Sequence, residues 1–307
     1  MLDIQNLSIR FTRYTFGLKK KEVCIVRSLD LSVSTGQVMA VIGQSGAGKS
    51  LLAHALLGIL PRNARIEGRV FFKGQPLTPE RQSAIRGREI ALIPQSVTYL
   101  NPLLRVGVQV ARAARLSGIN QKDVPATVSR AFARYLLQKK VAAWFPFQLS
   151  GGMARRVLTA TATVGMADLI LADEPTSGLD PITAREALGH LRELAYTGKA
   201  VLLITHDIET ALQVADMVTV FCAGTTVEVA RADDFKGLGH LRHPYTRALW
   251  AALPTNSFIG TMKPIERTSD TGGCPFRLCC NDQDAVCGQS VPELKQAGEG
   301  WVRCHHA

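Results

Sequence analysis

The sequence predicts an α/β fold with a mostly parallel sheet, an antiparallel β part at the N-terminus, an inserted α-helical segment and a small Cys-rich C-terminal extension. Three observations predict it. Apolar strand-like runs alternate with helix-like segments in the second half of the chain, and residues from about 98 to 164 have helical periodicity almost throughout. Five of the seven cysteines lie after residue 273.

The overall composition is that of a globular protein. With 307 residues, 46% of them apolar and 20% charged, the chain suits one large domain and a small appendage. The formal net charge of +11 would suit nucleic acid, an anionic membrane surface or nucleotides. Because no dense Lys/Arg cluster is interleaved with aromatics, we expect no nucleic-acid partner; Lys19, Lys20 and Lys21 are predicted to form an exposed loop.

Neither a membrane span nor a signal peptide is expected. No run of 18 apolar residues occurs, and Met1 to Arg10 lacks the basic-then-apolar layout of a secretory signal. We therefore expect a cytoplasmic chain whose cysteines are reduced rather than paired in a disulfide framework.

In the first part of the chain, strands are expected before and after one glycine-rich turn. Residues 2–11 and 23–33 read as strands around a basic loop, and residues 37–42 form a buried apolar strand that ends in glycine. A helix follows over residues 49–59. Two further short strands are predicted at residues 69–73 and 90–93.

The later elements alternate between helix and strand. Helices are predicted over residues 106–116 and 124–138, after residues 149–152, and over 181–196 and 245–253; strands are predicted at 169–172 and 200–205. Little periodicity follows Pro254. The composition changes near residue 238, which predicts a core domain over 1–238, with a helical subdomain at about 98–164, and an extension over 239–307.

A phosphate-binding loop joins the buried strand at residues 37–42 to the helix that follows. Its pattern fits both the spacing and the strand-to-helix context, and its residues are Gly43, Gln44, Ser45, Gly46, Ala47, Gly48, Lys49 and Ser50. The glycines let main-chain N–H groups approach phosphates, and the helix N-terminus adds positive dipole. Lys49 would reach the β- and γ-phosphates, and the Ser50 hydroxyl would bind Mg²⁺. ATP and Mg²⁺ are the expected ligands.

Two carboxylates end the buried strand at residues 169–172. Asp173 would hold the same Mg²⁺ through water, and Glu174 would orient and deprotonate an attacking water. Acids at strand ends are common in many folds, so this pair alone would be weak evidence for a nucleotide site. Together with the phosphate loop it becomes strong evidence.

Further segments resemble those of the ABC ATPases and occur in that family's order. Leu149-Ser150-Gly151-Gly152-Met153 resembles the signature motif, Ile93-Pro94-Gln95 the Q-loop, Ser177-Gly178-Leu179-Asp180 the D-loop and Ile204-Thr205-His206-Asp207 the switch histidine. The chain is thus identified as a member of this family of P-loop nucleotide hydrolases, and the resemblance covers nearly its whole length.

The resemblance implies that two ATPase subunits meet head to tail and share each ATP. Ser150, Gly151 and Gly152 would contact the nucleotide on the other subunit's phosphate loop, since a helix start suits a γ-phosphate. Asp180 belongs to the same site, His206 would contact the γ-phosphate, and Gln95 would sense Mg²⁺ and couple the site to membrane subunits. Phe11 is the expected adenine-stacking residue, with Tyr14 as the alternative.

One departure from the family follows the signature motif. Ala154 and Arg155 stand where arginine and glutamine are common, which changes the helix without touching Ser150 or the two glycines.

The C-terminal segment resembles the extension of ATPases that energise dipeptide, oligopeptide and nickel importers. His243-Pro244-Tyr245-Thr246-Arg247 carries the first part of that resemblance, and the spacing of Cys274, Cys280, Cys287 and Cys304 carries the second. Four thiolates in a loop-rich segment fit a metal centre, either a [4Fe–4S] cluster, which the resemblance favours, or Zn²⁺. Cys279 is not expected to be a ligand, while His305 and His306 are possible substitutes.

The expected function is ATP hydrolysis that energises a membrane importer for di- or oligopeptides, with nickel or a metal chelate as the alternative cargo. The expected partners are two transmembrane permease subunits, a second and different ATPase subunit and an extracytoplasmic substrate-binding protein. This places the chain at the cytoplasmic face of the bacterial inner membrane. A soluble ABC ATPase of DNA repair or translation is disfavoured by the short chain, and a non-hydrolysing regulator by Glu174 and His206.

Overall fold

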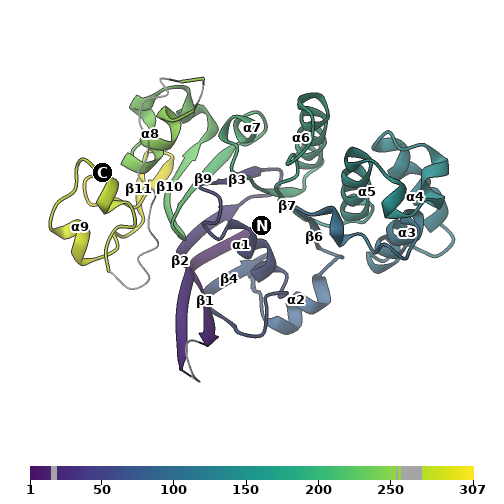
Figure 1. Ribbon diagram of the computed structural model, residues 1–307, viewed down its shortest axis with the longest axis horizontal. Helices are drawn as coiled ribbons and strands as arrows, with labels where there is room; N and C mark the ends of the chain where they lie inside the picture. The colour runs from purple at the N-terminus through teal and green to yellow at the C-terminus, as the bar shows by residue number, and fades with distance from the viewer. Residues whose placement is uncertain (15–18, 254, 257–271) are drawn as a thin grey trace. The chain divides into compact units, whose positions relative to one another are not determined.

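The computed structural model describes the chain except for residues 15–18, 254 and 257–271 (Figure 1). It divides into two compact units. The first comprises Met1–Ser34, Met39–Leu77 and Thr205–Ala307, and the second comprises Thr35–Val38 and Thr78–Ile204.

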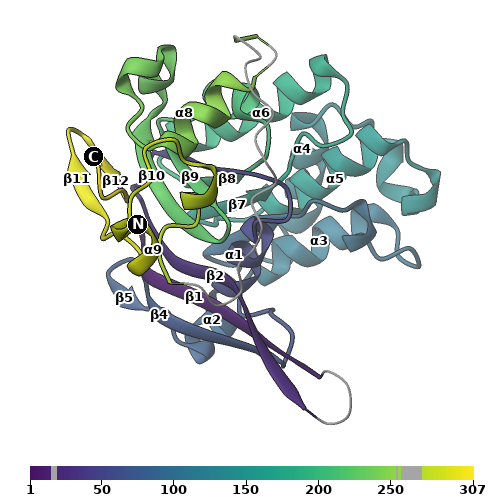
Figure 2. The ribbon, with the colours of Figure 1, turned by 60° about the vertical axis from the view of Figure 1, so that its left-hand side comes forward.

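An antiparallel sheet opens the first unit, in the strand order β2-β1-β4-β5 (Figure 2). Its strands are β1 (Leu2–Tyr14), β2 (Lys20–Val33), β4 (Ala64–Phe72) and β5 (Gln75–Pro76). This confirms the predicted antiparallel β part, but the first two strands are longer than expected. Tyr14 pairs with Lys20, whose ammonium lies 5.8 Å from the Tyr14 ring, so Lys20 and Lys21 are exposed strand residues and not part of a loop.

The phosphate loop belongs to a second β layer of the first unit. Here β3 (Val38–Ile42) pairs in parallel with β9 (Met217–Cys222), which pairs antiparallel with β10 (Thr225–Arg231). Every residue of β3 is buried, as expected for a strand covered on both faces. The helices α1 (Lys49–Leu56) and α7 (Ile208–Leu212) complete this part; α1 ends earlier than the predicted residue 59.

The C-terminal segment of the first unit contains more regular structure than the sequence predicts. After the 3₁₀ turns Ala232–Lys236 and Leu238–His240 come α8 (Pro244–Ala251), the turn Arg277–Cys279, α9 (Val286–Gln289), β11 (Lys295–Ala297) and β12 (Gly300–Val302). The β11–β12 hairpin extends the sheet, because β12 pairs antiparallel with β10 (Figure 2). The predicted boundary near residue 238 lies inside this compact unit.

The second unit combines a parallel sheet with the predicted helical insertion. Strands β6 (Ile90–Ile93), β7 (Leu169–Asp173) and β8 (Ala200–Ile204) pair in parallel, and the helices are α2 (Pro79–Ile85), α3 (Val106–Leu116), α4 (Val124–Arg134), α5 (Gly151–Thr163) and α6 (Pro181–Tyr196). Short 3₁₀ turns occupy Val97–Tyr99, Lys139–Ala143 and Pro146–Gln148.

The helical insertion has an apolar core of its own. Helices α3, α4 and α5 lie together in the second unit (Figure 1) and bury Val106, Val110, Phe132, Tyr135 and Val157 against one another. Helix α4 ends at Arg134 and not at the predicted residue 138, because the chain turns at Leu136, which has a φ of 54°. Among the helices of the described residues, none has the length and apolar character needed to cross a membrane.

Candidate functional site

The phosphate loop is shaped by glycines with left-handed backbone conformations. Gly43, Gly46 and Gly48 have φ values of 150°, 78° and 97°. A Cβ on Gly43 would lie 2.1 Å from the carbonyl oxygen of Phe221 in β9, so that position accepts only glycine. The neighbouring strand therefore holds the start of the loop, and the main chain of the loop faces the N-terminus of α1.

Lys49 lies at the centre of this loop as the first residue of α1. Its side chain is buried, and its ammonium donates to the carbonyl oxygens of Gly43 at 2.7 Å and Gln44 at 3.0 Å. These contacts aim the positive charge into the curve of the loop, where it would meet bound phosphates. Ser50 follows it in the first turn of the helix.

Three of the predicted residues lie at the carboxyl ends of the parallel strands of the second unit. Gln95 follows β6, while Asp173 ends β7 and Glu174 follows it; β6 and β7 are paired up to Ile93 and Ala172. Asp173 and Glu174 are buried and Gln95 is exposed. The sheet thus brings together the side chains predicted to bind Mg²⁺ and to activate water, at the edge where open α/β sheets bind ligands.

Glu174 has an unusual backbone conformation for a residue with a side chain. Its φ is 47°, and its N–H donates to the Ile204 carbonyl oxygen of β8 at 2.8 Å. Left-handed conformations cost free energy in residues other than glycine, and they are often found at functional sites. The conformation turns the chain sharply after Asp173 while keeping Glu174 at the strand end.

The signature residues form the start of α5. Ser150 caps the helix by accepting the N–H of Met153 at 3.3 Å. Gly151 and Gly152 face open space, since a Cβ built on either would meet no atom within 4 Å. The fold of the second unit therefore does not require glycine at these positions.

Asp180 caps the next functional helix, α6. Its carboxylate accepts the N–H groups of Ile182 at 3.1 Å and Thr183 at 3.0 Å and the Thr183 hydroxyl at 2.7 Å. These bonds hold the pKa of Asp180 below its usual value. The bond from the Thr183 hydroxyl has the largest effect, and the bond from the Thr183 N–H comes second.

The other predicted residues lie in the first unit with the phosphate loop. His206 is exposed just before α7, whose start is capped by Asp207 through the N–H of Thr210 at 3.0 Å. Phe11 is half-buried in β1 and pairs with Val23 of β2, while Tyr14 is exposed near the end of the same strand.

Arg155 is a residue whose role the sequence did not indicate. It is buried in α5, where Nη1 donates to the carbonyl oxygens of Pro94 at 2.8 Å and Gln95 at 2.6 Å and Nη2 donates to that of Ser177 at 3.2 Å. Burial lowers the pKa of its guanidinium, and the negative charge of Asp173 opposes this shift. Arg155 therefore joins the Q-loop and the D-loop of the second unit. The only sequence signal was its departure from the family's usual residue.

The four predicted metal-binding cysteines lie in the C-terminal part of the first unit. Cys274, Cys287 and Cys304 are buried and Cys280 is half-buried. Burial raises the pKa of Cys274 to about 11, and the charges of Cys304, Cys287 and Cys280 add to this effect.

A second feature missed by sequence reasoning lies behind the phosphate loop. Tyr245 of α8 is fully buried, and burial, followed by the charge of Cys222, raises its pKa far above the usual value, while the Gln44 main chain acts in the opposite direction. Its ring packs against Phe276 with centroids 5.4 Å apart. Tyr245 and Phe276 thus belong to the same buried core as Ala40 and Ile42 of β3, the strand that leads into the loop.

Sequence comparisons agree with this arrangement. A family model described as "ABC transporter" matches residues 26–177. The dipeptide transport ATP-binding protein DppD of Bacillus subtilis is 32% identical over 312 residues, covering 95% of this chain and 90% of that protein. The oligopeptide transport ATP-binding protein OppD of Escherichia coli is 32% identical over 311 residues, covering 97% and 91%.

Solved structures agree on the fold. The dimeric ATP-binding cassette MJ0796, in a post-hydrolysis state with ADP and phosphate, is similar with a TM-score of 0.66 and 24% identity over 76% of this chain and 99% of that chain. The α/β class and the ATPase-type cassette predicted from the sequence are confirmed. The chain belongs to the ATP-binding subunits of ABC transporters, in the group that contains the dipeptide and oligopeptide transport ATP-binding proteins.

Proposed function

We propose that this chain hydrolyses ATP to energise the import of di- or oligopeptides through a membrane transporter. The observation that carries the proposal is the similarity to dipeptide and oligopeptide transport ATP-binding proteins, which spans at least 95% of this chain in both cases. Because it includes the C-terminal segment, it concerns more than the shared ATPase core. The names of these relatives favour peptides over nickel or a metal chelate as cargo.

The proposed chemistry assigns each polar residue one task. Lys49 and the main-chain N–H groups of Gly43 to Ser50 bind the phosphates, and Ser50, Gln95 and Asp173 hold Mg²⁺, which would neutralise charge on the transferred phosphoryl group. Glu174 takes the proton of the attacking water, and His206 contacts the γ-phosphate. The buried position of Glu174 at the strand end supports its role as the base.

A second ATPase subunit would complete the site. The open space at Gly151 and Gly152, with the capped start of α5 beside it, supports the approach of another subunit's nucleotide to the main chain there. We infer a head-to-tail pair with a different ATPase chain, two transmembrane permease subunits and an extracytoplasmic peptide-binding protein. The chain then acts as a peripheral protein at the cytoplasmic face of the inner membrane.

The cysteine-rich segment forms a metal centre within this proposal. Cys274, Cys280, Cys287 and Cys304 would hold a [4Fe–4S] cluster, with Zn²⁺ as the alternative. Cys274, Cys287 and Cys304 are buried and all four cysteines lie in one short segment, which supports a shared site. The cluster would stabilise the segment when bound, and the four thiolates would orient it.

The test is Glu174→Gln in the transporter purified with its membrane subunits. We expect ATP to bind as before, while hydrolysis falls by about 100-fold or more because the amide cannot accept the proton of water. Glu186→Gln, at an exposed position on α6, is the matched control and should leave the rate unchanged. Equal hydrolysis by the wild type and Glu174→Gln would remove Glu174 from the mechanism.

A further inference from the structure

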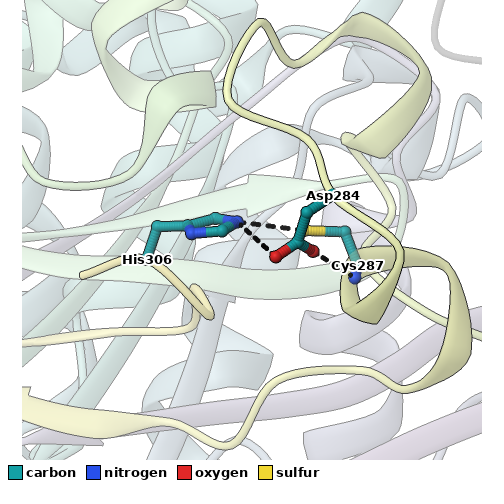
Figure 3. Close-up of side chains that lie close together, drawn as sticks. All are labelled: Asp284, Cys287 and His306. Atoms are coloured by element: carbon teal, nitrogen blue, oxygen red, sulfur yellow. Dashed lines mark hydrogen bonds and ion pairs between the residues drawn. The ribbon is translucent and has the colours of Figure 1, made fainter.

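Three potential metal ligands of different kinds meet beside the cysteine cluster. The Sγ of Cys287 lies 3.5 Å from Nε2 of His306, and the same nitrogen lies 3.5 Å from Oδ2 of Asp284 (Figure 3). All three ligand atoms lie within 4.8 Å of one another. Asp284 is not among the ligands expected for the four-cysteine centre, and His306 is expected there only as a substitute for a cysteine.

The three side chains are positioned by the local structure of the tail. Asp284 lies two residues before α9 and Cys287 lies within that helix, so the two are three residues apart in sequence. The N–H of Cys287 donates to Oδ1 of Asp284 at 3.1 Å, which leaves Oδ2 to face the imidazole. His306 follows β12, and its own N–H donates to the Sγ of Cys304 at 3.4 Å. The trio is therefore built before any ion binds.

The distances suit a tetrahedral zinc ion. With Zn–S, Zn–N and Zn–O bonds of about 2.3, about 2.0 and about 2.1 Å, tetrahedral angles place neighbouring ligand atoms about 3.3 to 3.6 Å apart. The sulfur–nitrogen and nitrogen–oxygen separations of 3.5 Å both fall in this range. The third separation, between the Cys287 sulfur and the Asp284 oxygen, lies within 4.8 Å.

We propose that Asp284, Cys287 and His306 form a mixed-ligand Zn²⁺ site, which shares only Cys287 with the four-cysteine centre. The side chains of Asp284 and His306 are 45% and 37% exposed, so a water molecule occupies the fourth position. Zn²⁺ binds the Cys287 thiolate, and the thiol proton leaves to solvent. Because Cys287 belongs to both ligand sets, Zn²⁺ occupies the trio in chains that hold no iron–sulfur cluster.

The experiment uses the full chain, freed of iron and zinc by a chelator under anaerobic, reducing conditions. Zn²⁺ and Co²⁺ are then titrated in competition with a chelating dye. We expect one ion per chain, and a Co²⁺ spectrum with the intense bands of tetrahedral coordination and a thiolate-to-metal transition. Thermal denaturation of the metal-free variants checks that each one folds.

Matched variants separate the two ligand sets. Asp284→Asn, which keeps the acceptor for the Cys287 N–H, and His306→Ala should each weaken Zn²⁺ binding by at least about 10-fold. His305→Ala is the neighbouring control, since that histidine contacts the Ser290 carbonyl oxygen and not the trio. Cys280→Ser should leave Zn²⁺ affinity unchanged, yet lower the iron and sulfide content of anaerobically purified protein.

Two outcomes would overturn the proposal. If Cys280→Ser abolishes Zn²⁺ binding and His306→Ala does not, zinc is held by the four thiols. If the metal-free chain binds no stoichiometric Zn²⁺, the His306–Asp284 contact is an ion pair only. Neither outcome bears on the ATPase assignment, which depends on the Glu174 measurement.

Discussion

His243 is a buried titratable residue at the start of α8. Its Nδ1 accepts the N–H of Tyr245 at 3.0 Å, and its own N–H donates to the buried carboxylate of Glu228 at 3.0 Å. Burial lowers the pKa of His243 from its usual 6.5 to about 3. In the folded protein the imidazole therefore stays neutral until the pH falls to about 3.

The depressed pKa of His243 predicts a specific loss of stability in acid. Below pH 6.5 the unfolded chain binds a proton at this residue and the folded chain does not, so the free energy of unfolding decreases as the pH falls, by about 1.4 kcal/mol per unit down to about pH 3. His243→Asn keeps a capping acceptor but cannot titrate. Urea denaturation at about pH 7.5 and about pH 5 should show the wild type losing about 2 kcal/mol more than the variant.

The control for this measurement is His240→Asn, at an exposed histidine in the preceding turn. It should keep the pH dependence of the wild type. If His243→Asn also keeps it, the imidazole gains a proton in the folded state and the predicted burial effect is absent.

At the scale of elements, α5 connects the signature motif to two loops of its own unit. Arg155 lies one turn after Ser150 and donates to the carbonyl oxygens of Pro94, Gln95 and Ser177. A movement of the Q-loop main chain would displace the Arg155 guanidinium, which also donates to the D-loop at Ser177. The arginine thus positions both loops.

Arg155→Met tests this connection by removing the donors and keeping much of the volume. Loss of a charge-assisted hydrogen bond of about 1.5–3 kcal/mol should lower kcat of the assembled transporter about 10- to 100-fold. The affinity for ATP should stay within about 2-fold, because phosphate binding uses the P-loop of the first unit. Arg155→Lys, with one ammonium for the same oxygens, should restore part of the rate.

A second arginine in the same unit provides the control. Arg192 of α6 lies over the ring of Tyr196 at 4.4 Å, so Arg192→Met should leave kcat and KM unchanged. A large increase in KM for ATP in Arg155→Met, with kcat intact, would contradict a positioning role for Arg155.

The elements that the sequence predicted well are those with local signals. Helix α6 matches the prediction in full because Asp180 caps it and Pro181 occupies its first position. Strands β11 and β12 have three residues each and depend on pairing with β10, which is distant in sequence. No local pattern could predict them. The burial of Arg155 could not be predicted either, since an arginine on a helix usually faces solvent.

At the scale of the whole molecule, the C-terminal segment shares a core with the nucleotide-binding part of the first unit. Ala40 and Ile42 of β3 belong to the same buried apolar cluster as Tyr245, Phe276 and Cys287. The resemblance of the sequence to peptide-importer ATPases indicated that this segment exists. It could not indicate this packing, because the contacts join segments separated by most of the chain. A metal centre in the tail would therefore also stabilise the layer that holds the phosphate loop.

Arg303 is the residue that tests whether the tail and this layer unfold together. Buried after β12, it donates to Asp30 at 2.6 Å and to the carbonyl oxygens of Thr226 and Pro292 at 2.9 Å each. Arg303→Met should lower the free energy of unfolding by about 3 kcal/mol, because the Asp30 carboxylate loses its charged partner. Arg231→Met, which removes an exposed pair with Glu299, should change it little. Amide exchange should accelerate in β12 and in β3 alike; acceleration confined to β12 would make the tail a separate folding unit.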